Sequence, residues 1–121
     1  MALTLYMLTQ GNTPVLKFGP CRYLEDSDLE IIVGYLAEAV KSTGKSVVTF
    51  RRRYSNAEYA DPTNEEYQPE PSHEYEPGKE NALQEFFQSC KDLISGWNDY
   101  GSVEIESGSE TITYGFVDID I

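Results

Sequence analysis

Two segments of this chain place apolar side chains at the spacing of an amphipathic helix, and β-rich runs lie on both sides of each segment. The first segment begins at Ser27-Asp28-Leu29-Glu30, an S-x-x-E capping box, and ends before Gly44. The second spans about Glu80 to Trp97. Each helix must bury its apolar stripe against another element, so the chain needs a second layer. The stripes consist of Leu29, Ile32, Val33, Leu36 and Val40 in the first helix, and of Leu83, Phe86, Phe87, Cys90, Leu93, Ile94 and Trp97 in the second.

The β-rich runs supply that layer. They read as five strands, and the first two are joined by Gly11-Asn12, a pair suited to a tight hairpin turn. The length of 121 residues fits a single domain, residues 1–121. We therefore predict an α+β fold, a two-layer sandwich with a five-stranded, mostly antiparallel sheet and two helices on one face, in the order β-β-α-β-loop-α-β-β. The predicted strands are Ala2–Leu8, Pro14–Phe18, Ser46–Tyr54, Ser102–Glu106 and Glu110–Ile121.

The last predicted strand changes its pattern part-way. Its apolar residues occupy even positions from Ile112 to Phe116 and odd positions from Val117 to Ile121, and Gly115 lies at the change. An extra residue in the strand would restore one apolar face. We therefore predict a β-bulge at Gly115.

A proline-rich segment at about residues 55–79 separates the two helices. Its four prolines and its lack of helix or strand spacing predict a long loop. The segment divides into three octads, each with Glu-Tyr at its third and fourth places. The tyrosines either fold back on the sheet or, with the carboxylates, form a strip for a partner. The candidate partner-binding residues are Glu58, Tyr59, Glu66, Tyr67, Glu74 and Tyr75.

The charge is strongly negative and unevenly distributed along the chain. The formal net charge is −12, with 21 Asp and Glu against 9 Lys and Arg. Residues 1–54 carry five acids and seven bases, whereas residues 55–121 carry sixteen acids and two bases. Direct binding to DNA or RNA is disfavoured, because that affinity comes from cations that displace counterions from phosphates. A negative surface instead attracts a basic partner.

Residues that could support catalysis are sparse. His73 is the only histidine and lies in the predicted loop, so a hydrolytic triad would need partners that are distant in sequence. Asp118 and Asp120 could hold a cation, but a charged edge strand accounts for them better. Arg51-Arg52-Arg53 could clamp an anion, although pairing with carboxylates such as Glu104 and Glu106 is favoured. Cys21 and Cys90 are expected to be reduced thiols. We expect no catalytic residues, metal site or cofactor.

These observations favour a non-enzymatic acidic binding protein that covers a basic surface of another macromolecule. Such a protein could act as a nucleic-acid mimic that inhibits a nuclease or another nucleic-acid-binding protein, by analogy with phage antagonists of bacterial defence nucleases and with immunity proteins. One alternative is a structural subunit that assembles through an edge strand. Another is a small-ligand binder that uses the Arg51–Arg53 strand. No segment reads as a membrane helix or a signal peptide, so we expect a cytoplasmic protein that does not bind membranes.

Overall fold

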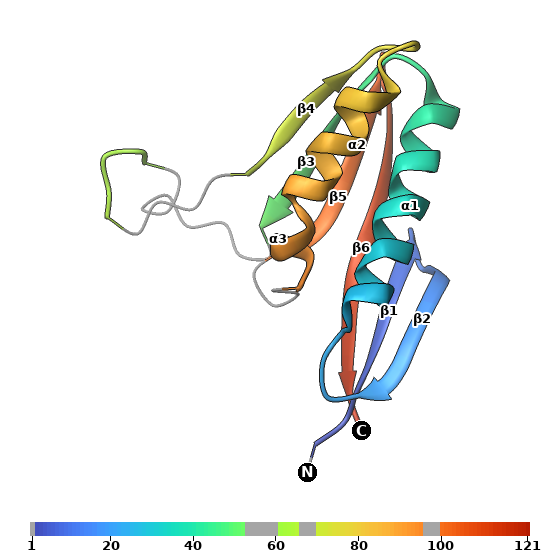
Figure 1. The fold of residues 1–121 in the computed structure, drawn as a ribbon, viewed down its shortest axis with the longest axis vertical. Helices are drawn as coiled ribbons and strands as arrows, with labels where there is room; N and C mark the ends of the chain where they lie inside the picture. The colour runs from blue at the N-terminus through green and yellow to red at the C-terminus, as the bar shows by residue number, and fades with distance from the viewer. Residues whose placement is uncertain (1, 53–60, 66–69, 96–99) are drawn as a thin grey trace.

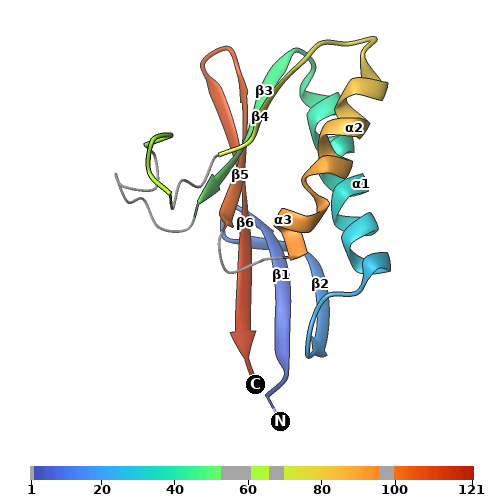
Figure 2. The same ribbon diagram turned by 60° about the vertical axis from the view of Figure 1, so that its left-hand side comes forward.

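The computed structural model describes residues 2–52, 61–65, 70–95 and 100–121. In these residues the fold is α+β, with a six-stranded antiparallel sheet in the order β2-β1-β6-β5-β3-β4 and three helices on one side of it (Figures 1 and 2). The predicted class is confirmed, but the predicted number of strands is wrong. The strands are β1 (Thr4–Gln10), β2 (Thr13–Cys21), β3 (Ser46–Arg52), β4 (Ser72–Tyr75), β5 (Tyr100–Ser107) and β6 (Glu110–Asp120), and the helices are α1 (Asp26–Thr43), α2 (Glu80–Ser89) and α3 (Lys91–Ser95).

The core lies between the helices and the facing side of the sheet. The described residues of both predicted helical stripes supply it, whereas Trp97 lies outside the described residues. Strand alternation sends every second side chain of the central strands into the core. Phe50 of β3 lies at its centre, with ring centroids 6.0 Å from Phe86, 6.2 Å from Phe87 and 6.4 Å from Phe116. The opposite side of the sheet, which we call the helix-free face, has no helix packed on it in the described chain (Figure 2). None of the described helices is long and apolar enough to cross a membrane.

Helix α1 begins two residues earlier than the sequence motif indicated. The N-cap is Glu25, whose side chain accepts the backbone N–H of Asp28, while the Asp28 carboxylate accepts the N–H of Glu25 at 2.9 Å. The predicted Ser27–Glu30 capping box is therefore wrong. An acidic pair with the same three-residue spacing performs the reciprocal bonding, and negative charge also suits the positive end of the helix dipole.

This cap predicts that two neighbouring substitutions differ in effect. Asp28→Ala should lower the free energy of unfolding by about 0.5–2 kcal/mol, because it leaves the Glu25 N–H without its acceptor. Ser27→Ala should change stability by no more than about 0.5 kcal/mol, because its side chain takes no part in the cap. Urea unfolding followed by circular dichroism measures both. A larger loss for Ser27→Ala than for Asp28→Ala would contradict this start of the helix.

Strand β4 lies inside the segment that the sequence predicted to be a loop. Pro71 and Pro77 lie on either side of it, but the four residues of β4 contain no proline and alternate as a strand requires. His73 faces the helices and stacks on Phe86 with a centroid separation of 5.0 Å. β4 pairs with β3 from Ser46↔Tyr75 to Thr49↔Ser72. The loop prediction is therefore wrong for residues 72–75.

The predicted second helix is two helices in the structure. It breaks at Cys90, whose N–H is shared between the carbonyl oxygens of Phe86 and Phe87, and α3 starts at Lys91. Cys90 is buried in the core, and burial raises the pKa of its thiol. The apolar stripe continues through the break, because Ile94 is buried as well. Both cysteines are free thiols, as expected.

Strand β6 has no bulge at Gly115. Pairing is uninterrupted on both sides, with Thr9↔Gly115 toward β1 and Ser102↔Gly115 toward β5. A Cβ atom at Gly115 would lie 2.8 Å from the Thr9 hydroxyl, so a close approach explains the glycine. The predicted bulge is wrong, and its absence has a consequence for the surface. Val117, Ile119 and Ile121 point to the helix-free face instead of the core.

Candidate partner-binding surface

The six candidate partner-binding residues fall into two groups. Glu58, Tyr59, Glu66 and Tyr67 lie outside the described residues. Glu74 is exposed on the helix-free face of β4. Tyr75 points the other way and is only 3% exposed, and its hydroxyl donates to Glu80 at 3.3 Å. Burial, together with the charge of Glu80, raises the pKa of the Tyr75 hydroxyl. Tyr75 is therefore a core residue and offers no surface to a partner.

Four carboxylates come together on the helix-free face of β3, β4 and β5. We call Glu70, Glu74, Glu104 and Glu106 the acidic cluster. Alternation places Glu104 and Glu106 on the same side of β5, and Glu74 follows on β4 across β3. The sequence pattern indicates Glu74 as a partner-binding residue, but it indicates Glu104 and Glu106 only as partners for arginine. Their membership follows from the strand order β5-β3-β4, which the sequence alone did not provide.

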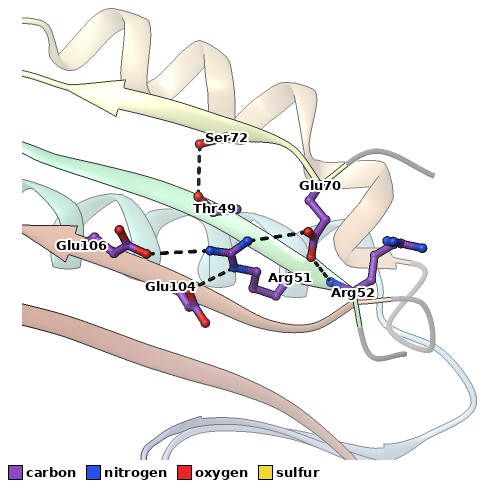
Figure 3. Close-up of polar contacts among 7 residues, drawn as sticks. All are labelled: Thr49, Arg51, Arg52, Glu70, Ser72, Glu104 and Glu106. Atoms are coloured by element: carbon purple, nitrogen blue, oxygen red, sulfur yellow. Dashed lines mark hydrogen bonds and ion pairs between the residues drawn. The ribbon is translucent and has the colours of Figure 1, made fainter. Parts of the chain in front are cut away.

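Arg51 lies among three members of the acidic cluster, Glu70, Glu104 and Glu106 (Figure 3). Its Nε donates to Glu104 Oε2 at 3.0 Å, and its terminal nitrogens lie 3.6 Å from Glu70 and 3.8 Å from Glu106. The hydrogen bond to Glu104 is the main cause that raises the pKa of the guanidinium. The predicted pairing of the arginine strand with Glu104 and Glu106 is confirmed for Arg51. Three carboxylates already occupy this guanidinium, so it is poorly placed to clamp a ligand anion.

Glu70 also fixes the backbone just before β4. One of its carboxylate oxygens accepts the Arg52 N–H at 3.0 Å, while the other faces Arg51 (Figure 3). The neighbouring carbonyl of Pro71 accepts the Phe50 N–H at 2.9 Å. Thr49 and Ser72 join the same strands through their hydroxyls at 3.1 Å. These bonds hold β4 in register, so the carboxylates lie on a paired sheet.

Negative charge exceeds positive charge around this cluster. A cleft of about 380 Å³ opens beside it, lined in part by Lys45, Glu74, Glu76 and Glu106. Lys45 and Glu76 are 4.0 Å apart. Counting the cluster with Arg51, Lys45 and Glu76 gives five carboxylates and two cations, a net charge of −3. Glu104 and Glu106 occupy alternate positions of β5, about 7 Å apart, so they lie within a Debye length of each other and their fields add beside the cleft.

The acidity of the second half of the chain does not form one face. Glu80, Glu85 and Asp92 belong to α2 and α3, on the opposite layer from the acidic cluster. Asp118 and Asp120 occupy even positions of β6, which face the helix side. The acidic residues that are concentrated in the second half of the sequence are therefore divided between two surfaces of the folded protein. Pairing moderates the helix layer, since Lys91 lies 2.6 Å from both Asp26 and Glu30.

The other candidate groups show no catalytic geometry. His73 is half-buried against Phe86, and β6 is an inner strand of the sheet, so the edge-strand explanation of Asp118 and Asp120 is wrong. In the described residues no three metal-ligating side chains converge. A cleft of about 570 Å³ beside α1 is lined in part by Ser42 and Thr43. Both hydroxyls donate to carbonyl oxygens of their own helix at 2.8 Å, so neither is poised as a nucleophile.

The two edges of the sheet are poorly suited to strand addition. β2 contains Pro14 and Pro20, which have no N–H to donate, and its pairing with β1 shifts register twice. β4 is only four residues long, and a proline lies close to each of its ends.

Comparisons with protein-family profiles, curated proteins and solved structures found no match. The function must therefore be inferred from the chemistry of the surfaces.

Proposed function

We propose that this protein is a non-enzymatic binding protein whose helix-free face covers a basic surface of a partner macromolecule. The partner class that fits best is a nuclease or another nucleic-acid-binding protein, because such proteins must expose a cationic surface to hold phosphate. In this role the carboxylates substitute for backbone phosphates. The protein would then act as a competitive inhibitor of nucleic-acid binding.

The observation that carries this proposal is the acidic cluster with its single embedded arginine. Surface carboxylates could serve only solubility, and for that role their position would not matter. Here four of them share one face of a hydrogen-bonded sheet, and the arginine among them leaves an excess of negative charge. An array of carboxylates with an excess of negative charge favours a cationic partner.

The two alternatives have weaker support. Assembly through an edge strand requires an unprotected edge, and both edges of this sheet carry or adjoin prolines. A small-ligand site on the arginine strand requires a guanidinium that is free to bind an anion. Arg51 is instead engaged by three carboxylates.

Displacement of DNA tests the proposal directly. A fluorescent DNA duplex is bound to each member of a panel of purified nucleases and DNA-binding proteins, and fluorescence anisotropy is followed as this protein is added. We expect the wild type to release DNA from at least one member without binding DNA itself. Release should weaken steeply as salt rises from about 0.05 to about 1 M, because the attraction is electrostatic.

Two triple variants with equal net charge separate location from total charge. Glu74→Gln/Glu104→Gln/Glu106→Gln removes three charges from the acidic cluster and its cleft. Glu85→Gln/Asp92→Asn/Glu110→Gln removes three exposed charges elsewhere. Only the first should lose the ability to release DNA. Equal loss in both variants, or no release from any panel member by the wild type, would refute the proposal.

A further inference from the structure

Strand β1 begins and β6 ends at the same end of the sheet (Figure 1). The helix-free face there carries a hydrophobic patch. It is formed on two paired strands, with Leu5↔Ile119 and Met7↔Val117 as partners, and the Ile121 N–H donates to the Leu3 carbonyl at 2.9 Å. Strand alternation places these side chains on one face, opposite to the core residues Leu8 and Phe116. The hydrophobic patch consists of Leu3, Leu5, Met7, Val117, Ile119 and Ile121.

The exposure of this patch is unusual for the protein. Leu3 is 40% exposed, Ile119 45% and Ile121 68%, and these three are among only five large apolar side chains exposed in the described chain. None of the six residues packs on the hydrophobic core. Single exposed apolar side chains are ordinary on proteins, but a contiguous set on one face is typical of an interaction site.

The hydrophobic patch and the acidic cluster lie on the same face of one sheet. Ile119 and Thr113 are on the same side of β6, and Thr113 pairs with Glu104. The six positions between them correspond to about 20 Å at about 3.3 Å per residue. Gly115, Thr9 and Ser102 occupy the space between the two regions, so small or uncharged side chains join them. A single interface of standard size spans both regions.

We infer that the hydrophobic patch is the apolar anchor of the partner interface, and that it binds apolar side chains that lie beside the basic surface of that partner. This inference rests on the proposed function and names the second half of the contact surface. Apolar burial contributes affinity, whereas the acidic cluster contributes attraction at a distance and orientation. A basic partner with neighbouring apolar residues satisfies both regions at once.

A second copy of this chain is a poorer occupant of the patch. Each copy carries a formal charge of −12, so association of two copies works against electrostatic repulsion. The cation of Lys17 borders the patch through the pairing of Lys17 with Met7. The acidic cluster on the same face outweighs that single charge. Charge complementarity therefore favours a cationic protein.

Two synthetic peptides of equal charge and length test this inference. One has six lysines followed by two serines, and the other has six lysines followed by two leucines, each labelled with fluorescein. An extended peptide of eight residues reaches about 26 Å, enough to span both regions. We expect the wild type to bind the leucine peptide about tenfold more tightly than the serine peptide in anisotropy titrations, because the leucines gain burial.

Variants assign the gain to the patch. Ile119→Thr/Ile121→Thr should abolish the tenfold difference and leave binding of the serine peptide unchanged, and threonine keeps the β-branched shape suited to a strand. Ile31→Thr is the matched control, because Ile31 is 53% exposed on α1 in the opposite layer. It should preserve the difference. Thermal unfolding verifies that each variant is folded.

Three results would overturn the inference. The leucine peptide could bind no better than the serine peptide, or Ile31→Thr could remove the difference as fully as the patch variant. Sedimentation could show a wild-type dimer that Ile119→Thr/Ile121→Thr converts to a monomer, which would make the patch a self-association surface. Failure of the proposed function looks different. In that case the leucine peptide still binds more tightly than the serine peptide, while Glu74→Gln/Glu104→Gln/Glu106→Gln leaves the affinity of both peptides unchanged.

Discussion

Replacing Phe50 by alanine should lower the free energy of unfolding by about 3–5 kcal/mol. Phe50 is fully buried on β3, and its ring contacts aromatic rings from α2 and β6 at centroid separations of 6.0–6.4 Å. Truncation removes the transfer free energy of the ring, leaves a cavity and deletes several aromatic contacts. Domains of this size are stable by about 5–15 kcal/mol, so this loss would remove about a fifth or more of the total stability.

Urea unfolding followed by tryptophan fluorescence and circular dichroism measures this loss. Tyr23→Ala is the matched control, because Tyr23 is an aromatic side chain that is 68% exposed. It should change stability by no more than about 0.5 kcal/mol. A loss below about 1 kcal/mol for Phe50→Ala would mean that the helices do not close over β3 as described.

The helices and most strands were predictable because their patterns are long. Leu29, Ile32, Val33, Leu36 and Val40 repeat at helical spacing over three turns, and all five are buried. Periodicity over that length outweighs any single residue. The start of α1 was misplaced because two motifs with the same spacing overlap. Ser27–Glu30 matches the commoner capping pattern, but the structure uses Glu25 and Asp28.

The predictions of a loop at residues 72–75 and of a β-bulge at Gly115 are wrong, because both features depend on pairing with neighbouring strands. Ser72–Tyr75 is too short to show a recognisable strand pattern in a proline-rich segment. It forms a strand because it pairs with β3. In β6 the change of apolar phase at Gly115 suggested an extra residue that would keep all apolar side chains on one face. In the structure β6 has no extra residue, so its apolar side chains face the core up to Phe116 and the helix-free face from Val117 onward. The sequence pattern alone does not distinguish this arrangement from a bulge.

The candidate surface was the least predictable part. Glu74 was identified from the octad pattern, but the same pattern also selected Tyr75, which lies in the core. Alternation along a strand places successive residues on opposite faces, so a Glu-Tyr pair in a strand cannot present both side chains to one partner. Glu70, Glu104 and Glu106 join Glu74 only through the order β5-β3-β4. The distribution of charge along the chain therefore indicates which residues are acidic, but it does not indicate on which surface of the fold they lie.

Charge changes within the acidic cluster should alter the rate of association with a cationic partner in opposite directions. Glu74→Gln/Glu104→Gln/Glu106→Gln reduces the local net charge from −3 to zero, so the association rate constant at low salt should fall by about tenfold or more. Arg51→Gln makes the local charge more negative, so the rate constant should rise. Dissociation should change less in both cases, because steering acts before contact.

Stopped-flow measurements with a DNA-binding protein from the displacement panel give these rates. Arg51→Gln should also lower stability, because Glu104 and Glu106 then face each other without the cation between them. Faster association by a less stable protein is a combination that a purely structural role for Arg51 does not produce. The rate constants of all three proteins should converge near about 1 M salt, where screening removes the steering. Slower association of Arg51→Gln at low salt would show that the arginine, and not the carboxylates around it, contacts the partner.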